Sequence, residues 1–106
     1  MDFKELAENL ELEENELLEL LGLFVETGYS DLNKLQSAIE DGDTEEAARV
    51  SHSIKGTSAN LGLMGIFELT KRIEMSVQNN DLYGATEAAK RIKEQLDGIA
   101  KALVKR

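Results

Sequence analysis

The sequence has 106 residues, and its 12 Lys+Arg against 21 Asp+Glu give a formal net charge of −9, which suits one domain without a nucleic-acid partner. The absence of cysteine excludes a disulfide scaffold, a thiolate metal site and a cysteine nucleophile, and the absence of proline argues against a turn-rich β-sandwich. No apolar run reaches the roughly 18–20 residues that span a membrane, and the acidic N-terminus is unlike a signal peptide. We therefore expect a soluble, cytoplasmic and mostly helical protein.

Two helices are predicted before residue 41. A short one follows Asp2, a good N-terminal cap, with apolar residues from Phe3 to Leu10 at helical spacing. A longer one ends at Gly42, which can adopt the left-handed conformation that closes many helices. Gly28 is a mediocre helix former that could bend this segment. The predicted inward residues of the longer helix are Leu17, Leu21, Phe24, Gly28, Leu32, Leu35 and Ile39.

A third helix is predicted from residue 44 to residue 61. Asp43 is its expected N-terminal cap, and Glu46, three residues later, completes a capping-box-like pattern. Gly62 and Gly65 then predict a tight corner.

Two more helices follow, at about residues 66–78 and after the polar break at residues 79–81. Four long amphipathic segments joined by turns of about 2–5 residues predict antiparallel neighbours. The expected fold class is all-α, an antiparallel up-down four-helix bundle with a short extra N-terminal helix, in which residues 1–106 form a single domain. The last helix has the most regular inward stripe: Leu82, Ala85, Ala89, Ile92, Leu96, Ile99 and Leu103.

The single histidine, His52, lies on the third predicted helix and faces away from the predicted core. At about 100° per residue it falls about 160° from Ile54, which lies in the inward stripe. A lone histidine is more often packed or merely exposed than functional, and the helical wheel argues only against the packed alternative. The inward stripe is Ala47, Val50, Ser51, Ile54, Ser58 and Leu61, and the stripe of His52 is Glu45, Arg49, Gly56, Ala59 and Asn60.

Gly56 lies one turn after His52, where glycine costs a helix about 1 kcal/mol relative to alanine. The missing side chain leaves space beside the imidazole for a partner's backbone or a phosphoryl group. Ala59 has a small side chain that does not fill this space. The alternative is that Gly56 allows another helix to pack closely.

The charge around His52 is uneven, because residues 47–67 contain no Asp or Glu. A group added at His52 would therefore meet cations, Arg49 and Lys55, from its own helix. Lys55 is a helix-surface neighbour that could reach such a group, although an ordinary solvated lysine is the default interpretation. Burial of a central helix also accounts for part of this depletion.

These features point to nucleophilic chemistry, in which a neutral imidazole nitrogen attacks phosphorus and holds the group as a phosphoramidate. The chain has no Gly-rich phosphate loop or Walker sequence, so we do not expect it to phosphorylate itself from ATP. One histidine without cysteine cannot supply a usual zinc site, and we assign no carboxylate a catalytic role.

The segment from His52 to Gly62, HSIKGTSANLG, resembles the signature of histidine-containing phosphotransfer (HPt) domains. In that signature the histidine is followed by one variable residue, a hydrophobic residue, Lys-Gly and two small residues. Leu69, Arg72, Ile73 and Glu74 continue the resemblance, because a second amphipathic helix with a Leu/Ile-Glu pair usually follows in the family.

The resemblance implies a monomeric bundle that shuttles phosphoryl groups between aspartates of response-regulator receiver domains. It makes His52 the phosphoacceptor, Lys55 the residue that hydrogen-bonds or screens the phosphoryl group, and Gly56 the opening for the receiver's active site. It implies no kinase activity and no cofactor on this chain, because Mg²⁺ belongs to the receiver.

The expected partners are a receiver domain, a hybrid sensor histidine kinase or both, with no nucleic acid and no membrane. Exposed apolar residues near His52 would bind the partner. Leu63 and Met64 are candidates, although core packing is an equal alternative for each. The other candidate partner-binding residues are Arg49, Ala59 and Asn60.

Three alternatives remain at this stage. A dimerisation-and-phosphoacceptor piece of a sensor kinase is disfavoured, because Ser53 follows His52 where an acid is typical and the chain has no proline. The phosphoacceptor domain of a hybrid or chemotaxis-type kinase shares the expected fold. A plain helical adaptor would leave His52 incidental.

Overall fold

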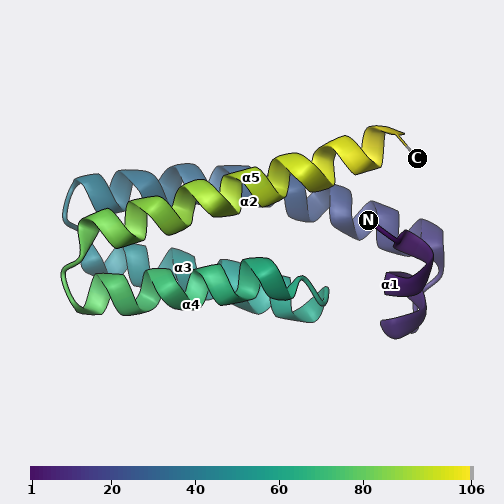
Figure 1. The fold of residues 1–106 in the computed structure, drawn as a ribbon, viewed down its shortest axis with the longest axis horizontal. Coiled ribbons are helices and arrows are strands. Elements are labelled where there is room, and N and C mark those ends of the chain that lie inside the picture. Colours follow the sequence, from purple (N-terminus) through teal and green to yellow (C-terminus); the bar gives the residue numbers. More distant parts are fainter. Residues whose placement is uncertain (106) are drawn as a thin grey trace.

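The computed structural model describes residues 1–105, which form five α-helices and no strand (Figure 1). Helix α3 lies beside α2 and α4, and α5 lies beside the same two helices, so α2 to α5 close an up-down four-helix bundle. The predicted fold class is confirmed. The helices are α1 (Phe3–Asn9), α2 (Glu14–Glu40), α3 (Thr44–Asn60), α4 (Met64–Gln78) and α5 (Leu82–Lys105).

The start of α3 follows from the residues that precede it. Gly42 has a φ of 70°, in the left-handed region, and terminates α2 as predicted. The Asp43 side chain then accepts a hydrogen bond from the Glu46 backbone N–H at 3.1 Å. The predicted capping box is only half formed, because the Glu46 carboxylate binds Arg49 and the Asp43 N–H donates to the carbonyl of Ala38 at 2.8 Å.

The corner between α3 and α4 is shorter than predicted. Gly62 has a φ of 71° and makes the turn, as glycine does at helix ends. Helix α4 already begins at Met64, so Gly65 lies in its first turn and the prediction that it belongs to the corner is wrong. A Cβ at Gly65 would lie 2.9 Å from the side-chain oxygen of Gln95, so the end of this α5 side chain lies over the first turn of α4.

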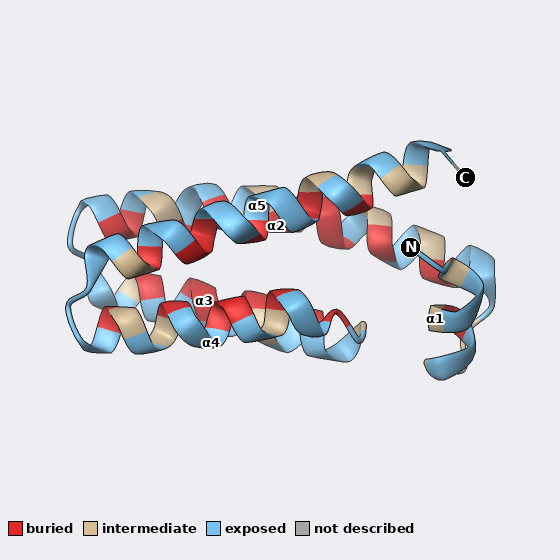
Figure 2. Cartoon of the chain, viewed as in Figure 1, coloured by how far each residue is buried: buried red, intermediate tan, exposed pale blue. Residues whose placement is uncertain are grey.

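The inner face of α3 is the face that the helical wheel predicts. Its inward residues from Ala47 to Ser58 are at most 3% exposed, and Leu61 is half-buried. The two buried serines need no partner from another helix, because Ser51 Oγ donates to Ala47 O at 2.7 Å and Ser58 Oγ donates to Lys55 O at 2.9 Å. Figure 2 shows the buried positions gathered where the helices face one another.

Helix α5 contributes the predicted stripe from Ala85 to Ile99, all of it buried. Leu82 is an exception, because it is the first residue of α5 and is 48% exposed at the end of the bundle. Leu103, near the other end, is half-buried. No helix in the described part of the chain combines the length and the apolar character needed to cross a membrane.

The helices differ in length, and this leaves one end of the bundle incomplete. Helices α2 and α5 have 27 and 24 residues, whereas α3 and α4 have 17 and 15. The N-terminal part of α2 and the C-terminal part of α5 therefore extend past the α3–α4 corner, and α1 folds against this end (Figure 1). Leu6 of α1 reaches the corner, because its Cδ1 lies 3.4 Å from where a Gly62 Cβ would be.

Helices α2 and α5 approach closely at Gly28, which is buried within an uninterrupted α2. A Cβ there would lie 3.1 Å from Leu96 Cδ2, and Leu96 is fully packed in the core. Next to this contact, Tyr29 donates a hydrogen bond to the Asp97 carboxylate, which lowers the pKa of Asp97 and raises that of Tyr29. Together these contacts connect the two long helices.

We expect Gly28→Val to lower the free energy of unfolding by about 1–3 kcal/mol, because its methyl groups would displace Leu96 from a filled core. The matched control is Gly98→Val, at an exposed helical site where a Cβ would meet no atom of residues 1–105 within 4 Å beyond the local backbone. The control should change stability by no more than about 0.5 kcal/mol. Denaturant unfolding of both variants measures the difference, and equal stabilities would contradict the close approach.

Candidate functional site

The imidazole of His52 lies on the outer face of α3, exposed to solvent. Among residues 1–105, no hydrogen bond or ion pair engages it. The neighbouring positions of its predicted stripe are exposed as well, so the whole outer face of the helix is open. The alternative of a histidine packed in the core is therefore wrong for this chain. These exposed positions are Glu45, Arg49, Gly56, Ala59 and Asn60.

Gly56 leaves the predicted space one turn beyond His52. A Cβ built on it would meet no described atom within 4 Å apart from the local helix backbone. The alternative that Gly56 admits a packed helix of this chain is therefore excluded within residues 1–105. A glycine inside an exposed part of a helix lowers stability, and here it brings no packing benefit among the described residues. The open space beside His52 is therefore the one physical effect of Gly56 that the structure shows for this part of the chain.

Arg49 carries its charge close to His52 but is already paired. Its Nε donates to Glu46 Oε2 at 3.1 Å, and Nη2 contacts the other oxygen of the same carboxylate. This hydrogen bond holds the pKa of Glu46 below its ordinary value and raises the pKa of Arg49. Both side chains are exposed, so the pair is weak and easily exchanged.

Lys55 is also paired, but with a residue of the neighbouring helix. Its Nζ lies 2.8 Å from Glu74 Oε1 on α4, and both side chains are 26% exposed. The helical wheel places only cations near His52, because it includes the residues of α3 and not those of the neighbouring helices. The default interpretation of Lys55 as an ordinary solvated lysine is wrong, since α4 supplies a carboxylate that the helical wheel of α3 cannot show.

The candidate partner-binding residues divide into exposed and buried ones. Ala59 and Asn60 are exposed on α3, close to the outer face of Gly56. Leu63 is only 8% exposed and belongs to the hydrophobic core, so its prediction as an exposed contact residue is wrong. It is the residue before α4, where the chain turns inward, whereas the next residue, Met64, is 52% exposed.

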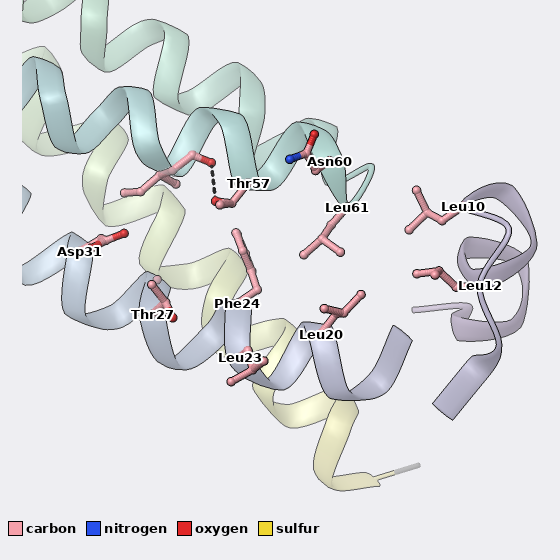
Figure 3. Close-up of a pocket in the computed structure, with 12 residues that line it drawn as sticks. Leu10, Leu12, Leu20, Leu23, Phe24, Thr27, Asp31, Thr57, Asn60 and Leu61 are labelled. Atoms are coloured by element: carbon pink, nitrogen blue, oxygen red, sulfur yellow. Dashed lines mark hydrogen bonds between the residues drawn. The ribbon is translucent and has the colours of Figure 1, made fainter. Parts of the chain in front are cut away.

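A groove of about 480 Å³ lies beside this face, between the α1–α2 segment, α2 and the last turns of α3 (Figure 3). Its walls are largely apolar, and Leu23 is 58% exposed. The Thr57 hydroxyl adds little polarity, because it donates to Ile54 O at 3.1 Å within its own helix (Figure 3). Residues that line the groove include Leu10, Leu12, Leu20, Leu23, Phe24 and Asn60.

The groove and the ion pair of Glu74 with Lys55 are the parts of the site that the sequence analysis missed. Both depend on which residues of different helices come side by side. The signal available for Glu74 was its place in the Leu/Ile-Glu pair of the following helix, but periodicity alone does not give the register against α3. Within residues 1–105, no cluster of three or more His, Cys, Asp or Glu side chains has an arrangement that could hold a metal ion.

An up-down helical bundle that presents one unpaired histidine, beside an open glycine and a nearby lysine, has the features of a histidine phosphocarrier module. The family model of the Hpt domain matches residues 19–102, which is most of the chain, and the protein belongs to that family. Membership places it in histidine phosphotransfer within two-component signalling. Comparisons with curated proteins and with solved structures gave no significant match.

Proposed function

We propose that His52 accepts a phosphoryl group from the aspartyl phosphate of a response-regulator receiver domain and passes it to the aspartate of another receiver. The observation that carries this proposal is the exposed imidazole of His52 beside the open space at Gly56. Membership in the Hpt family supports the same chemistry. The protein would act as a cytoplasmic monomer, alone or with a hybrid sensor kinase.

The proposed transfer is a displacement at phosphorus. An unprotonated ring nitrogen of His52 attacks the phosphorus atom of the acyl phosphate, so that a P–N bond forms as the P–O bond to the aspartate breaks. The receiver's aspartate leaves as a carboxylate, and the second ring nitrogen retains its proton. The reverse steps return the group to a carboxylate oxygen of another receiver. Mg²⁺ would be supplied by the receiver, and ATP takes no part on this chain.

Two neighbours of His52 have distinct proposed roles. Lys55, three residues later on α3, would contact the phosphoryl oxygens, because a phosphoryl group adds roughly −1.5 to −2 charge that a nearby cation stabilises. Gly56 would admit the receiver's aspartate and the residues around it. The transfer needs close and aligned approach of the two proteins, and any side chain at this position would lie in its way.

The apolar groove provides a surface for the receiver beside the phosphoacceptor. Its α3 wall belongs to the helix that carries His52, and Asn60 is both in that wall and on the exposed stripe. An exposed apolar patch with polar surroundings is typical of a protein-binding surface. We propose that an apolar element of the receiver occupies this groove, with Arg49 and Ala59 at the edge of the contact.

The direct test is phosphotransfer to wild type and His52→Gln. We expect wild type to acquire acid-labile, alkali-stable phosphate from a phosphorylated receiver with Mg²⁺, and from phosphoramidate as a small donor. The variant should acquire none, because glutamine lacks a nucleophilic ring nitrogen. Radiolabelled phosphate on gels treated with acid or alkali measures this, and label that survives the substitution would refute the assignment of His52.

Gly56→Leu should keep the fold, because the added side chain points into space that residues 1–105 leave open. We expect transfer from the receiver to slow by about tenfold to a hundredfold, since leucine holds the two reacting groups apart. Gly98→Leu, at another open helical position, should transfer at the wild-type rate. Rapid-quench kinetics measure the rates, and equal rates in the two variants would exclude a role for Gly56 in access.

Leu23→Asp should weaken receiver binding, because it places a charge in the apolar groove. We expect the receiver concentration for half-maximal rate to rise about fivefold or more, with little change in the maximal rate. Leu82→Asp is the matched control, because Leu82 is exposed to a similar degree but lies at the first residue of α5. If both variants bind the receiver as wild type does, the groove is not the docking surface.

A further inference from the structure

The two cations next to His52 are held by different kinds of ion pair. Arg49 and Glu46 lie on the same helix, and both are exposed. Lys55 instead reaches from α3 to α4, where its Nζ lies 2.8 Å from Glu74 Oε1. The side chains of both residues are about three-quarters buried. Partial burial reduces screening by solvent and salt, so the pair between the helices is the stronger constraint on its lysine.

We propose that Glu74 is a positioning residue that holds Lys55 while His52 is unmodified and releases it when His52 carries the phosphoryl group. This inference rests on the proposed function of His52. Phosphorylation would then proceed with an exchange of ion pairs, in which the Lys55 ammonium leaves the Glu74 carboxylate and binds the phosphoryl oxygens. No covalent bond of Lys55 or Glu74 changes in this exchange.

The charges and the shape of lysine support such an exchange. Its ammonium is a compact charge on a flexible stem of four carbons, so it can move between two acceptors without moving the helix. The phosphoryl group carries roughly −1.5 to −2 charge against −1 on a carboxylate, so it is the stronger competitor. The net stabilisation of phosphohistidine by Lys55 is then the difference between its interaction with the phosphoryl group and its interaction with Glu74.

Glu74 would therefore determine how readily the protein gives up its phosphoryl group. A lysine without a competing partner would stabilise phosphohistidine fully and retain the group. The Glu74 carboxylate offsets part of that stabilisation and also repels the phosphoryl charge, which favours transfer to the next aspartate. A carrier has to release its group as well as accept it, so this balance suits the proposed function.

The test is the equilibrium ratio of phosphohistidine to phosphoaspartate, measured with a receiver that exchanges phosphate with the wild-type protein. We expect Glu74→Gln to raise this ratio roughly twofold to fivefold, because a partly exposed ion pair contributes only a modest free energy. In a Lys55→Met background, Glu74→Gln should change the ratio far less. The matched control is Glu68→Gln, which removes the exposed Glu68–Lys71 pair within α4 and should leave the ratio unchanged.

The outcomes separate this inference from the proposed function. Label that remains on His52→Gln would refute the phosphoacceptor itself. Label on His52, with an equal ratio for Glu74→Gln and Glu68→Gln, would overturn only the ion-pair exchange. A rise of equal size for Glu74→Gln in both Lys55 backgrounds would also overturn it, because Glu74 would then act on the phosphoryl charge directly and not through Lys55.

Discussion

Burial of one face of α3 between α2 and α4 is the constraint on which the site depends. Because a helix turns about 100° per residue, fixing Val50 and Ile54 in the core fixes His52 on the opposite side. Small side chains on the buried face allow this close packing, and the hydroxyls of Ser51 and Ser58 are satisfied by their own helix. The exposure of the imidazole is therefore a property of the whole bundle, and no local loop has to hold it.

The charge around His52 is set by pairs of residues more than by the net charge of −9. Arg49 and Lys55 both lie near the imidazole, and each already has a carboxylate partner, Glu46 and Glu74. In the proposed function, a phosphoryl group on His52 would compete with these carboxylates for the two cations. The two pairs differ in that Arg49 is 65% exposed and its partner Glu46 lies on the same helix, whereas Lys55 is 26% exposed and its partner Glu74 lies on α4.

Features that depend on neighbouring residues in the chain were predictable from the sequence. The cap at Asp43, the turn at Gly42 and the outward direction of His52 follow from local chemistry and from the period of one helix. Features that depend on how two helices meet were not. Leu63 is exposed or buried according to where α4 begins, and Glu74 becomes a partner of Lys55 only through the register of α4 against α3. The groove likewise depends on how α2, α3 and the segment after α1 come together.

In the proposed function, the overhang of α2 past the α3–α4 corner would separate phosphotransfer from partner binding along the length of the molecule. The reactive face lies on the middle of α3, whereas most of the groove is built from α2 and the segment that follows α1. If the groove binds the receiver as proposed, substitutions at its exposed leucines would alter the choice of partner while every atom around the imidazole stays in place. On that proposal, one scaffold could be directed to a different signalling circuit without a change at His52.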